Sequence, residues 1–548
     1  MIKLSKIKIF GLGGLAENGK NCYVIEIDNS IFVFDGGLKY ANSNLLGIDY
    51  IMPDFSYLIK NKKKVKGIFV THGHSENMGS IADLVKDLPN VLVYATKFTK
   101  FVLEEHGVNE KNIVEIKAHK KINFENGVSI FPISVSHSIP DAVMYVINSK
   151  DGSICYTGDF MIDPTMLGNY DMDLGKIAYV GKQGVLCMLC ESTFSEKVGH
   201  TSPNHRLEEF FKDIIKHNDK RIIFSLLPYH LYTINDIFNA ARNTHRKIII
   251  MGKKLQNVVN FAIKEKYLEV EPNIIGDLSN VKDEDAILLV SDERTNPYAN
   301  VSKILHGYDK FISQKSTDTV VFAEPRYDSN EKTLVKLENE LAKFGCNIIN
   351  IPSDKEILLH PSSEDIMLMI KLIQPKYFMP VKGEYRYMVN NANLANRLGI
   401  GKDNIILKQN GEVVTFENGI LVDKCDKVKV NDVLIDGLSN EDVGELVIKD
   451  REMLSENGIV LISATISKKD KVLIVGPEVT TRGFIYVKDS KDLIEEIKNI
   501  CENIIIRNIT PTFVDYNKIK VEIREELSNY LYKETECKPM IIAVVQEV

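Results

Sequence analysis

The sequence predicts an α/β protein in which a strand-rich part is interrupted by a parallel α/β insert and followed by a small α+β domain. Three features of the sequence predict this. Short runs rich in Val, Ile, Phe and Tyr fill residues 1 to about 195, the apolar spacing becomes helical from about 206, and strand-like sequence resumes after a helix at 363–373. A chain of 548 residues holds about three or four domains of ordinary size.

The first part is expected to be mainly strand. Its apolar runs are separated by Gly, Asn and Asp, which favour turns. The best helix candidate in this part is 79–88. The expected strands lie within residues 7–10, 21–27, 30–37, 67–72, 91–96, 128–137, 153–160 and 185–193.

The insert, about 205–352, alternates helices and strands, which is typical of a parallel sheet. It begins with apolar residues at helical spacing, namely Leu207, Phe210, Phe211, Ile214 and Ile215. The elements expected after this helix are a strand at 221–225, a helix near 233–244, a strand at 247–251, a helix near 255–266, a strand at 286–290, a helix at 330–344 and a strand at 347–351.

The last part begins after a polar stretch at 423–445, which predicts a connector. The sequence from 446 onward predicts a small α+β domain. Its expected elements are strands near 446–449, 459–467 and 471–476, helices near 490–504 and 517–533, and a final strand at 541–545.

Composition and charge exclude several classes of protein. Lys and Arg number 68 against 75 Asp and Glu, so the net charge of −7 excludes a globally basic nucleic-acid binder, and RNA would have to be held by local patches. With 44% hydrophobic and 26% charged residues, the chain is not broadly disordered. No apolar run approaches the ~18 residues of a membrane span, and the first residues lack the apolar block of a signal peptide. We therefore expect a cytoplasmic protein with no membrane partner.

The most informative segment is Thr71-His72-Gly73-His74, which follows an apolar strand at 67–70. Two His residues at i and i+2 in a loop after a strand can direct imidazole nitrogens at one metal ion, and zinc accepts such ligands. An isolated H-x-H is a weak pattern, so other polar residues at strand ends must support it.

Three such residues stand at the ends of predicted strands: Asp35, His137 and Asp159. A carboxylate at Asp35 can orient a metal-bound His. Each residue alone is more simply interpreted as a polar loop residue. Taken together, these residues and the two histidines are better interpreted as one site, because ligands at the ends of neighbouring strands can converge on one pocket.

Cys187 and Cys190 form a C-x-x-C pair, which can indicate a metal or redox site. The sequence holds no second such pair, and GVLCMLCEST is an apolar run. The better interpretation is two small apolar residues in a buried strand.

The ordered His and Asp residues resemble the metallo-β-lactamase superfamily, whose signature is H-x-H-x-D-H followed by His, Asp and a late His. The resemblance is closer to the ribonuclease J family of the β-CASP branch, and within it to the catalytically weak second paralogue. It covers essentially the whole chain, including REMLSENGIV and GPEVTTRGFIYV in a domain that generic metallo-β-lactamases lack. Further matches are GLGGLAENGKNCYVIE, LLGIDYIMPD, THGH, VSHSIPDAV, YTGDF, PKYFMPVKGEYR and LKQNGEVV.

The resemblance implies a metallo-β-lactamase αββα sandwich with an inserted β-CASP α/β domain and a small α+β C-terminal domain. It also implies two Zn²⁺ ions that act on RNA phosphodiesters. The expected boundaries are 1–205 and 353–422 for the two parts of the metallo-β-lactamase domain, 206–352 for the β-CASP domain, 423–445 for a linker and 446–548 for the C-terminal domain.

The metal ligands of the family are only partly kept. Four ligand positions match: His72, His74, His137 and Asp159. Where the family has Asp-His this chain has Glu76 and Asn77, and Lys382 replaces the last His. Asn is a poor substitute for imidazole, whereas a protonated Lys cannot bind a metal but places an ammonium where a cation sat. We expect one weakly held Zn²⁺, with Glu76 as a partial ligand, or none; Mg²⁺ or Mn²⁺ would serve an active enzyme.

The positions that handle RNA in the family are altered as well. The family's H-V-S-G-H stretch falls on Glu356 to His360, so that only the match to the catalytic His is kept. Glu356 would repel a 5′ phosphate, and Leu358 offers no hydroxyl. The S-N-x-x-R stretch ends at Thr233 without its Ser and Arg, and the G-S-Q-G-E-P stretch falls on 290–295, which holds two acids.

These losses fall on metal, catalytic and phosphate positions, while distant scaffold sequence is kept. The first hypothesis is therefore a ribonuclease J-like subunit with little or no catalysis, which supports an active paralogue in RNA processing and decay as a homodimer or heterotetramer. One alternative is an active metal-dependent endoribonuclease or 5′-3′ exoribonuclease with His360 as proton donor. Another is a non-catalytic RNA-binding or scaffold protein.

Overall fold

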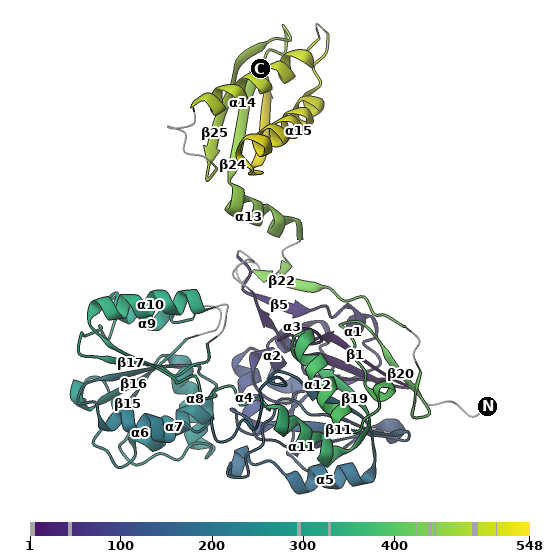
Figure 1. Ribbon diagram of the computed structural model, residues 1–548, viewed down its shortest axis with the longest axis vertical. Coiled ribbons are helices and arrows are strands. Elements are labelled where there is room, and N and C mark those ends of the chain that lie inside the picture. Colours follow the sequence, from purple (N-terminus) through teal and green to yellow (C-terminus); the bar gives the residue numbers. More distant parts are fainter. Residues whose placement is uncertain are drawn as a thin grey trace. The chain divides into compact units, whose positions relative to one another are not determined.

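The computed structural model describes residues 6–41, 47–292, 297–326, 330–422, 425–436, 441–442, 445–484, 491–510 and 512–548 (Figure 1). The chain divides into two compact units, Met1–Tyr40 with Asp49–Val433, and Ala41–Ile48 with Leu434–Val548. The residues that match the metal ligands all lie in the first unit.

Two sheets face each other in the first unit, and parallel and antiparallel strand pairs occur in both. The strand order of the first sheet is β21 (Ile420–Val422), β20 (Val414–Glu417), β1 (Lys6–Gly13), β2 (Cys22–Ile27), β3 (Ser30–Phe34), β6 (Val65–Phe69), β7 (Val93–Ala95) and β8 (Ile113–Glu115). The order of the second is β19 (Pro375–Val381), β13 (Val185–Glu191), β12 (Gly152–Tyr156), β11 (Val143–Ser149), β10 (Ser129–Ser134) and β9 (Ile122–Asn123).

Aromatic side chains fill the core between these sheets. The ring of Phe34 lies 5.6 Å from that of Tyr145 on the facing sheet, measured between centroids. Successive residues of a strand point to opposite faces, and β13 is buried on both. Cys187 therefore packs in the core between the sheets and Cys190 on the opposite face, which confirms that both are buried core residues.

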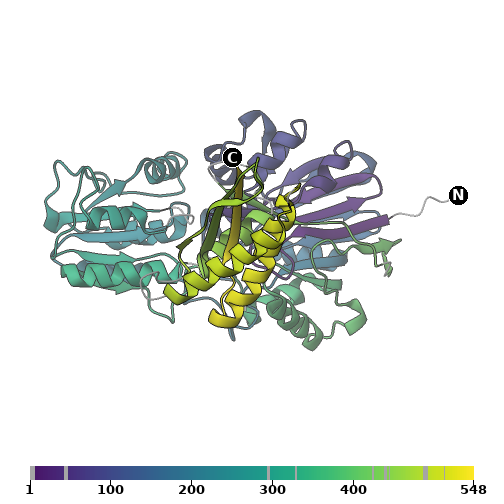
Figure 2. The same cartoon turned by 90° about the horizontal axis from the view of Figure 1, so that it is seen from above.

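Helices cover the outer faces of both sheets. The first sheet is covered by α3 (Ile81–Asp87) and α4 (Lys97–Glu105), and the second by α5 (Leu174–Gln183), α11 (Ser363–Ile373) and α12 (Tyr385–Arg397). Figure 2 shows the two strand layers between the two helix layers. This order confirms the predicted αββα sandwich.

The insert contains a parallel sheet with helices on both faces, as its alternating sequence predicts. Its strand order is β15 (Lys247–Met251), β16 (Ala286–Ser291), β14 (Ile222–Leu226), β17 (Thr319–Phe322) and β18 (Asn347–Asn350). One face is covered by α6 (Glu208–Lys216), α7 (Leu231–Ala241) and α8 (Lys253–Lys264), the other by α9 (Ala299–Leu305) and α10 (Glu331–Phe344).

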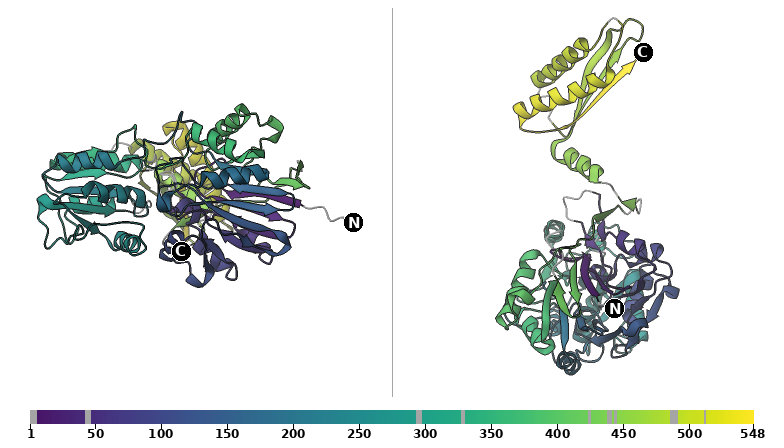
Figure 3. Two further views of the ribbon diagram at one scale, coloured as in Figure 1. Left: turned by 90° about the horizontal axis from the view of Figure 1, so that it is seen from below. Right: turned by 90° about the vertical axis from the view of Figure 1, so that its right-hand side faces the viewer.

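The second unit contains a sheet of order β25 (Leu473–Arg482), β24 (Ile459–Ile466) and β26 (Met540–Glu547). The right-hand view of Figure 3 shows α14 (Lys491–Arg507) and α15 (Tyr516–Thr535) on one face of this sheet. Every second residue of β24 is buried under these helices. This alternation is the reason why the sequence predicts a strand there.

The predicted strand at 446–449 is wrong, because these residues belong to α13 (Glu445–Asn457). The apolar run Leu-Val-Ile is short enough for a strand, but it leads into Arg-Glu-Met-Leu, which favours helix. Within the predicted linker, residues 423–424, 437–440 and 443–444 lie outside the described residues, and β22 (Asp432–Asp436) pairs with β23 (Glu441–Asp442). The predicted domain boundaries stay predictions.

Shorter elements complete the described chain near the site. β4 (Lys39–Tyr40) pairs with β5 (Tyr50–Pro53), and the short helices α1 (Ser56–Lys60) and α2 (Ser75–Met78) flank β6 in the sequence. None of the described helices combines the length and the apolar composition that crossing a bilayer requires.

Asp236 of α7 provides a test of the insert's packing. It is buried and accepts a hydrogen bond from the backbone N of Leu207 at 3.2 Å. Burial raises the pKa of its carboxyl to about 7. Because the folded pKa lies above that of the unfolded chain, its contribution to stability is complete below about pH 4 and is lost as the pH rises through about 7.

We expect Asp236→Asn to raise the melting temperature at pH 8 by a few degrees, which corresponds to a gain of about 1–2 kcal/mol in the free energy of unfolding. The gain at pH 5 should be smaller. The amide oxygen of Asn can still accept the bond from Leu207. Thermal unfolding at both pH values measures the effect. Asp213→Asn on α6, where the side chain is 74% exposed, is the control and should change neither curve. An equal gain at pH 5 and pH 8 would contradict the assignment.

Candidate metal centre

Four side chains from three strand ends meet at one edge of the sandwich. His72 and His74 follow β6, His137 follows β10, and Asp159 follows β12. The structure brings these residues together, with one ligand atom of each within 4.8 Å of the others. His72, His137 and Asp159 are buried, whereas His74 lines a cleft between the sandwich and the insert.

The spacing of the four ligand atoms is close to that of a zinc site. The Nε2 atoms of His72 and His137 each lie 3.1 Å from Nδ1 of His74. Asp159 Oδ2 lies 3.4 Å from His72 Nε2 and 3.9 Å from His137 Nε2. A tetrahedral zinc ion with bonds of about 2.0–2.1 Å holds its ligand atoms about 3.3 Å apart. The donor set therefore fits one ion of this kind.

The hydrogen bond of His137 leaves a lone pair on the nitrogen that faces the other ligand atoms. His137 Nδ1 lies 3.1 Å from the carbonyl oxygen of Leu359, which can only accept, so Nδ1 carries the proton and Nε2 a lone pair. Burial lowers the pKa of His72 to about 4 and also lowers the pKa values of His74 and His137. Neutral imidazoles are the form that binds metal ions.

Lys382 enters this centre from the end of β19. Its Nζ forms an ion pair with Asp159 Oδ2, the same oxygen that lies nearest His72 Nε2. Burial raises the pKa of Asp159, but the ammonium of Lys382 and the neighbouring histidines together hold that pKa below its usual range. Burial likewise lowers the pKa of Lys382, but the carboxylates of Asp159, Glu191 and Glu76 together raise it, so the net shift is upward. Both groups therefore stay charged.

Asp35 anchors the loop that carries the histidines. The backbone N of Thr71 donates to it at 2.8 Å, Tyr156 Oη at 2.7 Å and Asn77 Nδ2 at 2.9 Å. Thr71 Oγ1 lies 3.0 Å from both Asp35 and His72 Nδ1, so the carboxylate orients His72 through Thr71. Burial raises the pKa of Asp35 to about 7, although these hydrogen bonds oppose the shift.

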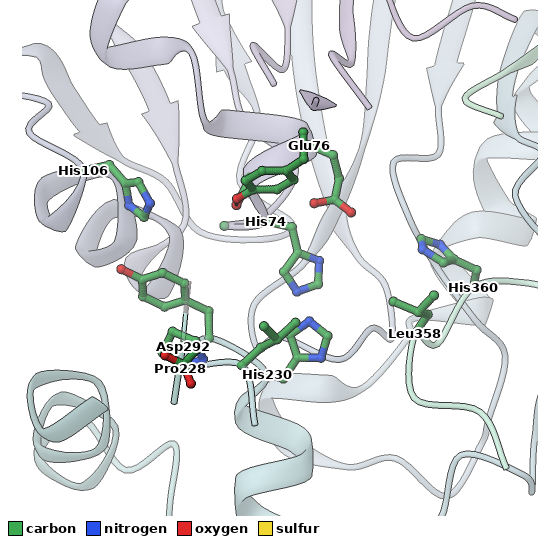
Figure 4. Close-up of a pocket in the computed structure, with 13 residues that line it drawn as sticks. His74, Glu76, His106, Pro228, His230, Asp292, Leu358 and His360 are labelled. Atoms are coloured by element: carbon green, nitrogen blue, oxygen red, sulfur yellow. The ribbon is translucent and has the colours of Figure 1, made fainter. Parts of the chain in front are cut away.

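The two residues that replace the family's Asp-His behave differently from each other. Asn77 is buried and bonds to Asp35, as described above. Glu76 lines the cleft (Figure 4), and its carboxylate is not part of the described groups of ligand atoms that lie within 4.8 Å of one another. The adjacent positions on α2 therefore face two different environments.

A second group of close side chains adjoins the first and contains Asp159, Glu191 and His360. Nδ1 of His360 lies 2.8 Å from Glu191 Oε2. Glu191 Oε1 accepts a bond from the backbone N of Phe160 at 2.7 Å, which fixes the carboxylate. Sequence reasoning missed Glu191, although it ends β13 before a polar turn, the same pattern that identified Asp159.

The cleft itself is formed by both parts of the first unit. Figure 4 shows the rings of His74 and His230 next to each other, and their centroids lie 5.0 Å apart. The sequence alone does not indicate this neighbour, because only the tertiary fold brings His230 to His74. Among the described lining residues the acids are Glu76 and Asp292, and there is no Lys or Arg.

The remaining altered positions lie around this cleft or close to it. Glu356 forms an ion pair with Lys197 and accepts a bond from the backbone N of Leu358 at 3.0 Å. Leu358 lines the cleft. Thr233 is buried on α7. In the segment 290–295, residues 293–295 lie outside the described residues.

Comparisons with known proteins agree with the fold. The chain matches the Beta-lactamase superfamily domain over residues 48–207, the Ribonuclease J, beta-CASP domain over 219–341 and the Ribonuclease J C-terminal domain over 446–548. A crystal structure of a protein of unknown function from Enterococcus faecalis V583 has a TM-score of 0.52 and 17% identity, with 75% of this chain and 100% of that chain covered. That likeness shows the fold alone.

Two curated relatives match nearly the full length. Ribonuclease J2 of Bacillus subtilis (strain 168) is 36% identical, over 99% of this chain and 99% of its own. Ribonuclease J 2 of Staphylococcus aureus (strain MRSA252) is 32% identical, over 100% of this chain and 99% of its own. With this identity over its whole length, the chain belongs to the ribonuclease J family, and within it resembles the second paralogue.

Proposed function

We propose that this chain is a ribonuclease J-like subunit of RNA processing and decay in the cytoplasm, with weak or absent nuclease activity of its own. The observation that carries the proposal is the ion pair between Lys382 and Asp159, because an ammonium stands where a second metal ion would need a ligand. In this proposal the chain supports an active paralogue, as a homodimer or as part of a heterotetramer.

The proposed metal site is limited to one ion. His72, His74 and His137 would hold it, with Asp159 as the fourth group. A Zn²⁺ ion held there supplies Lewis acidity toward a phosphodiester oxygen; Mg²⁺ or Mn²⁺ would serve if the chain is active. The ligands of the family's second ion are changed in this chain, since Asn77 donates to Asp35 and Lys382 pairs with Asp159.

The cleft is poorly suited to the charge of RNA. A phosphodiester backbone is held by Lys and Arg, and the described lining residues include neither, whereas Glu76 and Asp292 are acidic. The nearby Lys197 is already paired with Glu356. RNA would therefore bind this cleft weakly, which supports low activity of the isolated chain.

One observation favours the alternative of an active nuclease. His360 lies at the cleft with its Nδ1 2.8 Å from Glu191 Oε2, and a carboxylate at that distance would favour a ring that carries the proton a leaving oxygen needs. This pair would be catalytically useful if one metal ion sufficed. The alternative and the main proposal differ in the rate of RNA cleavage that they predict.

For cleavage of a 5′-monophosphorylated RNA with added Mn²⁺ or Mg²⁺, we expect a rate at least 100-fold below the ~1 s⁻¹ that is common for enzymes. His74→Ala should abolish what remains, because it removes one of three imidazoles. His217→Ala, at a side chain that is 66% exposed, is the matched control and should leave the rate unchanged. A rate near 1 s⁻¹ for the wild type, lost in His74→Ala, would replace the main proposal with the active nuclease.

Support of a paralogue should not depend on this chain's metal centre. We expect the full-length protein and its His74→Ala variant to co-elute equally with the ribonuclease J paralogue from the same organism in size-exclusion chromatography. RNA cleavage by the two mixtures should agree within about twofold, since the paralogue supplies the catalytic groups. Separate elution of the two chains, together with tight salt-dependent RNA binding by this chain alone, would favour the scaffold hypothesis instead.

A further inference from the structure

The residues His72, His74, His137 and Asp159 form the group of possible metal ligands. Among the residues that the structure describes, Lys382 is the only Lys or Arg that forms an ion pair with this group. Its side chain is 1% exposed, as is that of Asp159. A buried ammonium is costly unless an anion compensates for it, and the same holds for a buried carboxylate. Each group therefore makes the burial of the other possible.

The backbone holds Lys382 in this place from both sides. Its N donates to the carbonyl oxygen of Gly14 at 2.8 Å, and its own carbonyl oxygen accepts from the N of Ser192 at 2.9 Å. Its φ of +48° is in the left-handed region, which is unfavourable for residues other than Gly. The ammonium is thus delivered to Asp159 by a fixed and partly strained segment, not by a freely moving surface side chain.

Asp159 Oδ2 has two roles that compete. By position it is the fourth atom of the tetrahedron formed with the three imidazole nitrogens, and it is also the oxygen that Lys382 binds. Its second oxygen, Oδ1, is buried and has no hydrogen-bond partner among the described residues. Without Lys382, the carboxylate would have no full positive charge next to it unless a metal ion were bound.

We infer that Lys382 is a tethered cation that replaces a metal ion: it keeps the centre assembled without metal and weakens the hold of the three-His pocket on a single divalent ion. This rests on the proposed metal centre and deepens it. The wild-type chain then folds equally well with and without Zn²⁺, and its occupancy never exceeds one ion. Removal of the ammonium makes the carboxylate available to the ion and makes the centre dependent on it.

The test compares the full-length wild type with Lys382→Met, which keeps an unbranched side chain, one atom shorter, but removes its charge. Lys376→Met is the matched control, because Lys376 lies on β19, the strand that ends just before Lys382, but is exposed. After dialysis against EDTA, the melting temperature is measured with and without Zn²⁺. Zinc affinity is measured by competition with a chromogenic chelator, and stoichiometry by elemental analysis.

We expect wild type and Lys376→Met to melt within about 1 °C of each other, with a shift of less than about 2 °C on Zn²⁺ addition, since weak ligands stabilise little. Lys382→Met should melt several degrees lower without metal, regain this with Zn²⁺, and bind Zn²⁺ at least 10-fold more tightly than wild type. Two zinc ions in the wild type, a wild type that needs Zn²⁺ to fold, or unchanged affinity in Lys382→Met would each overturn the inference.

If Lys382→Met does not fold without metal, its refolding with Zn²⁺ supports the inference and failure to refold with Zn²⁺ overturns it. The wild-type melting curves and stoichiometry test the inference independently of any variant. Its failure is also distinguishable from failure of the proposed function. A wild type that cleaves RNA efficiently with one ion bound contradicts the proposed function alone, whereas two bound ions contradict the inference.

Discussion

The centre of this protein depends on one electrostatic constraint, the burial of the Asp159 carboxylate among neutral imidazoles. The effective penalty for burying a carboxylate is several kcal/mol, and neutral imidazoles do not compensate its charge. Lys382 does, and the end of β19 holds it there through bonds to Gly14 and Ser192. The three strand ends remove this pair from water, and contact between the two charges offsets that cost.

The same reasoning explains the character of the cleft. A site that binds RNA concentrates positive charge where phosphates lie, and this cleft is lined by acids and imidazoles instead. Lys197, beside the altered position Glu356, is paired with that carboxylate. Together with the net charge of −7, this lining agrees with the weak binding of RNA that the proposed function includes. Any contact with RNA would then depend on surfaces elsewhere or on a partner.

Much of this centre could be predicted from the sequence, because polar residues at the ends of neighbouring strands lie along one edge. That pattern identified His72, His74, His137 and Asp159. It would also have identified Glu191, which was overlooked because its strand was considered for its cysteines alone. His230 could not be found in this way, since it reaches His74 only through the packing of the insert on the sandwich.

The fold could also be predicted from the pattern of the sequence. The prediction was wrong where the pattern is short. Long elements with a clear period, such as the helix beginning near Leu207, were identified because one face of each is buried. The segment 446–449 was misassigned because three apolar residues fit a strand or a helix equally well, and only the following residues decide. Asn77 and Glu76 show the same limit, since the direction of a side chain on a short helix is set by its tertiary neighbours.

Three of the polar residues that differ from the family's pattern form hydrogen bonds or ion pairs with their neighbours. Asn77 donates to Asp35, Lys382 binds Asp159, and Glu356 binds Lys197. Substitutions that merely accumulate after a function is lost leave buried polar groups without partners, at a cost of about 1–3 kcal/mol each. Here each of these three side chains has a partner of suitable chemistry. The centre is therefore folded and paired around residues of different chemistry, which is what the proposed supporting subunit requires.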